Sequence, residues 1–104
     1  MAADVSDLPH NLIDETIHQR TRLAIMALLA GVESLEFNEV KAQLQLTDGN
    51  LATHLGSLER AGYVSVTKAF KGKKPQTTLA MTPKGRSALE RYVSLLQSIL
   101  DKAK

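Results

Sequence analysis

Two apolar helical patterns separated by only two residues constrain the fold of this chain more than any other feature. The first pattern is an i, i+3, i+7 set that predicts a helix from Phe37: Phe37, Val40 and Leu44. The second predicts a helix that starts at Thr47 and buries three leucines: Leu51, Leu55 and Leu58. Gln45 and Leu46, the two residues between them, leave no room for antiparallel packing. The two helices should therefore cross steeply, as in a helix-turn-helix.

After Gly62 the apolar pattern changes to period two, which predicts two strands near residues 63–70 and 77–81. The tip of this hairpin is rich in lysine: Lys71, Gly72, Lys73, Lys74 and Pro75. Residues 35–37 could add a short third strand, and the sequence leaves this open. We therefore expect an α+β fold, mainly α: a winged helix-turn-helix with a two-stranded or three-stranded antiparallel wing.

Further helices are predicted on both sides of this motif. Residues 19–30 form an apolar helix that stops at Gly31, a good residue for the position after a helix end. Residues 8–15 are predicted to form a short helix with three apolar contacts: Leu8, Leu12 and Ile13. Thr82 and Pro83 suit the N-cap and first position of a long final helix that runs to about Ala103.

The final helix has an apolar stripe with spacings of three and four residues: Leu89, Tyr92, Leu96, Ile99 and Ala103. Val93 and Leu100 widen this stripe. Its distal end is longer than so small a body needs, which favours packing against a second subunit over packing back on its own core. We expect a dimer contact formed by Leu12, Leu89, Tyr92, Leu96 and Ile99.

The chain has 104 residues, which is enough for one domain with one core. We divide this single domain, residues 1–104, into the helix-turn-helix at 37–61, the wing at 63–82 and the C-terminal helix at 83–103. There are no cysteines, so disulfides and thiolate sites are excluded. Asp4 and Asp7 occupy the N-terminus, and no apolar run reaches the roughly 18 residues that span a membrane. We expect a soluble, cytoplasmic protein that does not bind membranes.

The net charge of +2 conceals a strong asymmetry along the chain. Residues 1–59 contain three basic and nine acidic residues, a net charge of −6. Residues 60–91 contain eight basic residues and one acidic residue, a net charge of +7. A basic segment of this kind is typical of a surface that binds a polyanion.

Four segments resemble the small single-domain winged helix-turn-helix transcriptional regulators that are allied to the MarR and ArsR groups. They are residues 18–23 (HQRTRL), 46–55 (LTDGNLATHL), 58–64 (LERAGYV) and 79–86 (LAMTPKGR). The resemblance implies a wing that lies along the phosphates or in the minor groove, and a two-fold dimer built from terminal helices. Metal sensing in the ArsR branch often uses cysteines, which this chain lacks.

The predicted second helix of the motif turns short polar side chains outward: Asn50, Thr53, His54 and Ser57. Asparagine can pair with adenine, threonine can offer its methyl group to thymine, and histidine and serine can donate or accept in the major groove. Thr47, at the start of the helix, completes the expected set on this helix, and Lys71, Lys73 and Lys74 are expected to contact the DNA from the wing. Asp48 is left out, because phosphates repel a carboxylate.

No catalytic centre is evident. His10, His18 and His54 lie on separate segments, and no paired carboxylates or glycine-rich phosphate loop accompany them. We expect no enzyme activity, no metal and no cofactor, and the sequence does not indicate an effector. The sequence thus predicts a homodimeric regulator of transcription that binds double-stranded DNA. Two alternatives remain open: a winged-helix module that binds protein without DNA specificity, and a binder of structured RNA.

Overall fold

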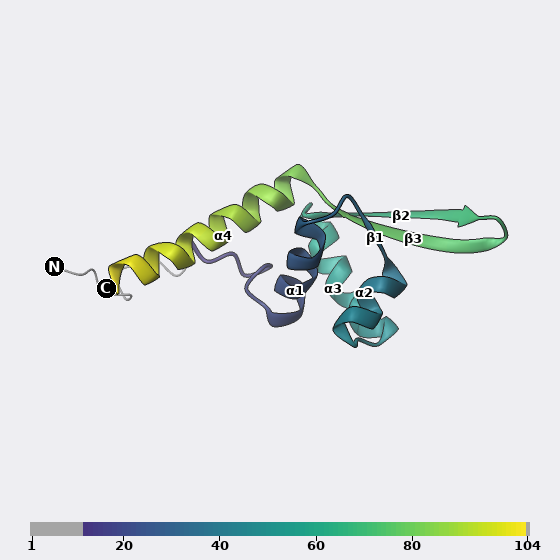
Figure 1. Ribbon diagram of the computed structural model, residues 1–104, viewed down its shortest axis with the longest axis horizontal. Helices are drawn as coiled ribbons and strands as arrows, with labels where there is room; N and C mark the ends of the chain where they lie inside the picture. Colours follow the sequence, from purple (N-terminus) through teal and green to yellow (C-terminus); the bar gives the residue numbers. More distant parts are fainter. Residues whose placement is uncertain (1–11, 104) are drawn as a thin grey trace.

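Three short helices and a three-stranded sheet form the body of the molecule, and a hairpin and a long helix project from it in opposite directions (Figure 1). The computed structural model describes residues 12–103. The elements are α1 (Arg20–Ala30), β1 (Leu35–Glu36), α2 (Phe37–Leu44), α3 (Asp48–Arg60), β2 (Val64–Lys71), β3 (Lys74–Met81) and α4 (Pro83–Lys102). The two projections give the molecule extents of 63 × 25 × 21 Å. The predicted winged helix-turn-helix architecture is confirmed.

Side-chain caps set the starts of three helices. The Gln19 side chain accepts a hydrogen bond from the backbone N–H of Arg22 at 2.8 Å and caps α1. Thr47 caps α3 and Thr82 caps α4, with Pro83 at the first position of α4, as the sequence predicted. Gln45 has a φ of 54°, and this left-handed residue lets the chain change direction between α2 and α3.

The sheet is antiparallel in the order β1-β3-β2. β1 supplies the third strand that the sequence left open, because Leu35 pairs with Leu79. β3 begins three residues earlier than predicted and β2 is shifted by one residue toward the tip, where Lys71 pairs with Lys74 across a two-residue turn. Gly72 opens this turn with a φ of 67°, which glycine adopts without strain.

Pro75 is compatible with this longer pairing. The residues that flank a two-residue turn exchange hydrogen bonds, so the next pair, Phe70 with Pro75, is a non-hydrogen-bonded pair. The missing N–H of Pro75 therefore faces the outer edge of the sheet at a point that β1 does not reach.

The core lies between α1, α3 and the inner end of the sheet. Its buried members are Ile17, Ile25, Met26, Leu29, Val40, Leu51, Leu55, Leu58, Val64, Leu79, Ala88 and Tyr92. The three leucines of α3 are buried as predicted, and Val40 is the buried member of the α2 set, with Phe37 and Leu44 packed partly against the core. One continuous apolar cluster therefore fixes α3 against α1 and the wing.

The segment before α1 differs from the prediction. Residues 8–11 of the predicted helix lie outside the described residues, and residues 12–19 form turns with no α-helix. The Asp14 carboxylate explains this, because it accepts hydrogen bonds from the backbone N–H groups of Thr16 and Ile17 at 3.0 and 3.2 Å. Its second oxygen accepts from the Tyr63 hydroxyl, so a contact far along the chain holds the turn in place.

Tyr92 also differs from the prediction that it lies in a dimer contact. Only 6% of the residue is exposed, and its hydroxyl lies 2.8 Å from His18 Nδ1. Tyr92 therefore attaches α4 to its own domain. Leu89 packs partly against the core, whereas three residues of α4 expose large apolar side chains: Val93, Leu96 and Leu100.

The close contact between α4 and the start of β2 requires a glycine. A Cβ atom at Gly85 would collide with the carbonyl oxygen of Tyr63, a backbone atom that cannot move aside. We expect Gly85→Ala to lower the free energy of unfolding by about 1–3 kcal/mol or more, as overpacking does. Urea unfolding measures this. The control is Gly49→Ala, where no atom lies within 4 Å of the added Cβ and helix propensity favours alanine. Equal stability of the two variants would contradict this account of Gly85.

Candidate nucleic-acid interface

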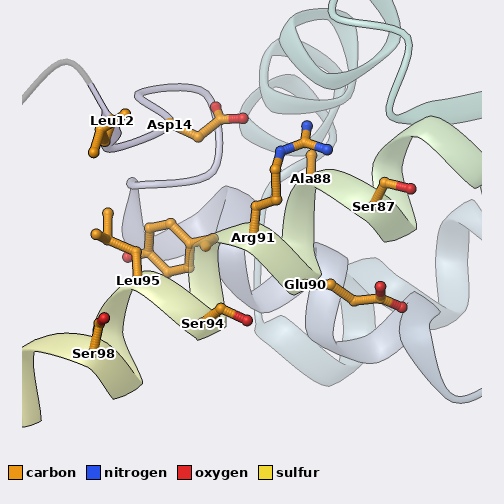
Figure 2. A pocket seen from close by; sticks show the side chains of 10 residues that line it. Leu12, Asp14, Ser87, Ala88, Glu90, Arg91, Ser94, Leu95 and Ser98 are labelled. Carbon is orange, nitrogen blue, oxygen red and sulfur yellow. The ribbon is translucent and has the colours of Figure 1, made fainter. Parts of the chain in front are cut away.

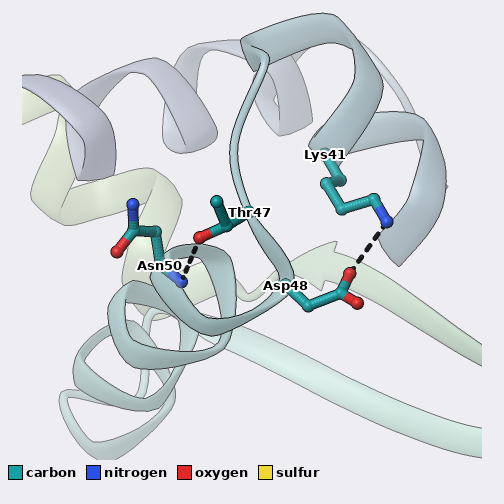
Figure 3. A network of polar contacts seen from close by, with 4 residues as sticks. All are labelled: Lys41, Thr47, Asp48 and Asn50. Carbon is teal, nitrogen blue, oxygen red and sulfur yellow. Dashed lines mark hydrogen bonds and ion pairs between the residues drawn. The ribbon is translucent and has the colours of Figure 1, made fainter.

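The first turn of α3 combines a cap with an ion pair (Figure 3). Thr47 Oγ1 accepts a hydrogen bond from the Asn50 backbone N–H at 3.1 Å, so this hydroxyl oxygen already caps the helix in the absence of a ligand. Lys41 Nζ of α2 lies 2.8 Å from Asp48 Oδ1. An exposed pair of this kind adds about 0–1 kcal/mol to stability. Its larger effect here is to offset the negative charge that a phosphate near this turn would meet.

The outward face of α3 centres on Thr53 and Arg60, which are exposed and seven residues apart. Ser57 lies beside them, half-buried, and accepts a hydrogen bond from Arg60 Nη2 at 3.4 Å. Arg60 also covers Gly56, because a guanidinium nitrogen lies 3.1 Å from the position of a Cβ there. Arg60 was not among the predicted site residues, although its helical spacing from Thr53 places it on this face.

His54 lies at the edge of this face, half-buried against α1. Its Nδ1 is 3.3 Å from Nη1 of Arg22. Arginine has no acceptor, so His54 Nδ1 accepts this hydrogen bond and its Nε2 carries the ring proton. Arg22 also donates to the backbone carbonyls of Thr16 and Glu15, which joins the N-terminal segment to α3. Arg22 was not predicted at the site either, because 32 residues separate it from His54.

This contact predicts how acid affects stability. Burial, followed by the charge of Arg22, lowers the pKa of His54 from its ordinary value of 6.5. The unfolded chain then binds a proton more readily than the folded chain, so His54 contributes stability above about pH 6.5 that is lost as the pH falls through the folded pKa. We expect His54→Gln to be less sensitive to acid than the wild type, measured by urea unfolding at pH 7.5 and 5.5. Identical acid sensitivity would show that folding does not lower the pKa of His54.

The tip of the wing gathers positive charge. Lys71 and Lys74 are cross-strand partners, Lys73 lies in the turn between them, and all three are exposed. Like charges directly opposite each other on a sheet destabilise it. Residues 64–81 contain no acidic residue to offset them. The hairpin therefore favours an anionic ligand, at a small cost in folding free energy.

A groove of about 590 Å³ separates α3 from the wing. Its walls come from α2, α3 and the inner part of the hairpin: Phe37, Ala52, Leu55, Gly56, Glu59, Val66, Lys68 and Thr77. The groove thus separates the wing from the side of α3 that carries Ala52, Gly56 and Glu59, and Asn50, Thr53, His54 and Ser57 do not line it. The three tip lysines lie beyond this groove, because the hairpin extends outward past α2 and α3 (Figure 1).

A second cavity of about 850 Å³ lies between the N-terminal segment and α4 (Figure 2). Leu12 and Leu95 lie on one side of it, with Ser94 and Ser98 below on the helix. Leu12 is 61% exposed, and Ile99, on the distal half of α4, is half-buried. The residues expected in a dimer contact therefore divide into Leu12 and Leu96 on the surface, Leu89 and Ile99 half-buried, and Tyr92 in the core.

Over residues 12–103, no helix is long and apolar enough to cross a membrane.

Comparison with known proteins identifies the family. Residues 21–100 match the model of a winged helix DNA-binding domain. An uncharacterized protein of Methanocaldococcus jannaschii is 44% identical over 72 residues, which are 69% of this chain and 78% of that protein. The solved structure of a transcriptional regulator homologue from Pyrococcus horikoshii OT3 superposes with a TM-score of 0.81 at 30% identity, over 88% of this chain and 90% of that one.

More distant structures share the fold. A MarR family regulator from Enterococcus faecalis V583 has a TM-score of 0.73 at 24% identity, over 93% of this chain and 86% of that one. An ArsR family regulator is also among the structural neighbours. The match over most of the chain, together with the helix-turn-helix and wing, shows that this protein belongs to the winged helix DNA-binding domain family and resembles the MarR and ArsR transcriptional regulators.

Proposed function

We propose that this protein is a transcriptional regulator that binds a specific sequence in double-stranded DNA as a homodimer. The observation that carries the proposal is one surface with two complementary parts. One part is the polar outward face of α3, and the other is the acid-free, lysine-tipped wing, whose inner end is separated from α3 by the groove. In a winged helix DNA-binding domain, these parts suit a helix in the major groove and a hairpin against the backbone.

The side chains of α3 have distinct roles in this proposal. Asn50 is exposed and suits a bidentate pair with adenine, and Thr53 offers a methyl group to thymine. His54 presents Nε2–H, so it contacts an acceptor such as guanine O6 or N7, or a phosphate. Ser57 and Thr47 add weaker contacts, because their hydroxyls already bond within the protein.

Dimerisation is proposed through the exposed apolar residues of α4. Val93, Leu96 and Leu100 are 55%, 43% and 56% exposed and follow a helical spacing of three and four residues. Ile99 extends the same contact, while Leu89 and Tyr92 hold α4 on its own core. Leu12 lines a cavity with Ser94 on another side of α4 and lies outside this stripe. A contiguous apolar surface of this kind on a small domain is typical of a subunit contact.

Occupancy is the proposed mechanism. The two copies of α3 would bind two half-sites in cytoplasmic DNA. The bound dimer would then exclude RNA polymerase from a promoter or recruit it there.

Selection of bound sequences from a randomised duplex pool tests this function. We expect one enriched motif with two-fold symmetry, bound with a strong dependence on salt. Alanine at Asn50, Thr53, His54 and Ser57 is the matched variant. Selection with this variant should enrich no motif, because each base contact that is removed costs about 1–3 kcal/mol of binding free energy. The variant should retain its non-specific affinity for DNA. No enrichment would favour a protein-interaction module, and a preference for A-form duplex would favour RNA.

A further inference from the structure

The wing carries a large apolar side chain in an unexpected place. Phe70 is 76% exposed, the most exposed of the large apolar residues in the described part of the chain. Its cross-strand partner is Pro75, and non-hydrogen-bonded pairs bring their side chains close together. The two side chains therefore form one apolar surface, which we call the tip pair.

Four lysines lie near the tip pair. Lys68 lies two residues back on the same face of the hairpin as Phe70, Lys73 lies in the turn, and the adjacent cross-strand pair, Lys71 and Lys74, lies on the opposite face. A single exposed apolar residue needs no explanation. An aromatic ring and a proline joined across two strands, with Lys68 on the same face and Lys73 in the turn, suit a ligand with both an apolar surface and a dense negative charge.

The position of the tip pair agrees with duplex DNA. Alternation along β2 places Phe70 on the same face as Val64 and Val66, which is the face that packs against α3. Six residue steps from Val64 to Phe70, at about 3.3 Å each, carry the ring about 20 Å from the core. Half a turn of duplex, about 17 Å, separates a major groove from the adjacent minor groove on the same side.

We propose that the Phe70–Pro75 tip pair makes an apolar contact with deoxyribose and base edges in the minor groove next to the major groove that α3 enters. The inference rests on the proposed function and adds a component of binding that it does not contain. Lysine contacts release counterions and depend on salt, whereas an apolar contact adds affinity without changing the salt dependence. The lysines hold the hairpin on the phosphates, and the tip pair packs between the two backbones.

Salt titrations of Phe70→Ser on a 30-base-pair duplex that carries the selected motif test the contact. We expect affinity to fall about tenfold at every salt concentration, as for an aromatic anchor, with an unchanged slope of log K against log salt. Phe70→Leu should retain most of the affinity. Ala69→Ser, on the opposite face of the hairpin, is the matched control and should stay within about twofold of the wild type. Circular dichroism and urea unfolding check that the variants remain folded.

Chemical footprints locate the contact. Hydroxyl radicals probe deoxyribose in the minor groove, and methylation of guanine N7 probes the major groove. Phe70→Ser should lose protection of the flanking minor groove and retain protection of the major groove. Full affinity and an unchanged footprint in Phe70→Ser would overturn the inference and leave the proposed function intact, and so would a salt slope lowered as in a lysine variant. A wild type that binds no duplex at all would refute both.

Discussion

Replacing Lys71, Lys73 and Lys74 together with alanine is expected to weaken binding to all DNA sequences alike. Removal of one phosphate contact lowers the salt slope by about 0.9, so removal of three lowers it by about 2.7. At physiological salt this corresponds to a decrease in affinity on the order of a hundredfold. The enriched motif should remain the same, because phosphate contacts carry no direct sequence information.

Anisotropy titrations at salt concentrations between about 50 and 300 mM, on specific and random duplexes, measure both effects of the wing variant. Lys102→Ala is the control for charge, since it removes one positive charge at the far end of α4, away from the wing. The wing strands should persist, because the three lysines are exposed and Lys71 and Lys74 repel each other. Equal salt slopes for wild type and the triple variant would show that the wing does not contact phosphate.

Leu96→Asp and Leu100→Asp are expected to produce folded monomers that bind a full site hardly better than a half-site. The side chains are 43% and 56% exposed in the single chain, so a charge there spares the core but opposes burial in a subunit contact. In a two-fold regulator the half-sites lie about 34–36 Å apart, and dimerisation combines two weak affinities into one strong one. Loss of the dimer therefore removes most of the affinity for the full site.

Sedimentation measures the oligomeric state of these variants, and titration of full and half sites measures the effect on binding. Ser94→Asp is the matched control, because it adds the same charge to α4 on a different side of the helix from Leu96. A wild type that stays monomeric at tens of micromolar would refute the proposed dimer. A dimeric Leu96→Asp variant would move the subunit contact to another surface.

The helix-turn-helix and the wing could be predicted from the sequence because local rules govern them. The capping residues Thr47 and Thr82 act within one helical turn, and the apolar spacing of α3 specifies which face enters the core. The same rules place Asn50 and Thr53 on the outside of α3. The extra length of β3 was missed because a two-residue turn at Gly72 can be distinguished from a longer loop only by strand pairing.

The contacts of Arg22 and Tyr92 could not be predicted from the sequence. Arg22 and His54 are 32 residues apart, and His18 and Tyr92 are 74 residues apart, so neither pair leaves a pattern of short period in the chain. Tyr92 fits the apolar stripe of α4 equally well whether it faces a partner or its own core. Asp14 is similar, because Tyr63 is what holds its carboxylate in the turn before α1.

Local sequence was enough to specify the elements, their order, their caps, the inward face of α3 and the charge of the wing, because these depend on residues within one or two turns of each other. Three features required the folded chain: the burial of Tyr92, the proton position that Arg22 sets on His54, and the meeting of Phe70 and Pro75 at the exposed tip. They depend on which distant segments pack together. The packing of distant segments follows from the burial of one shared core, and the spacing of residues along the chain does not specify it.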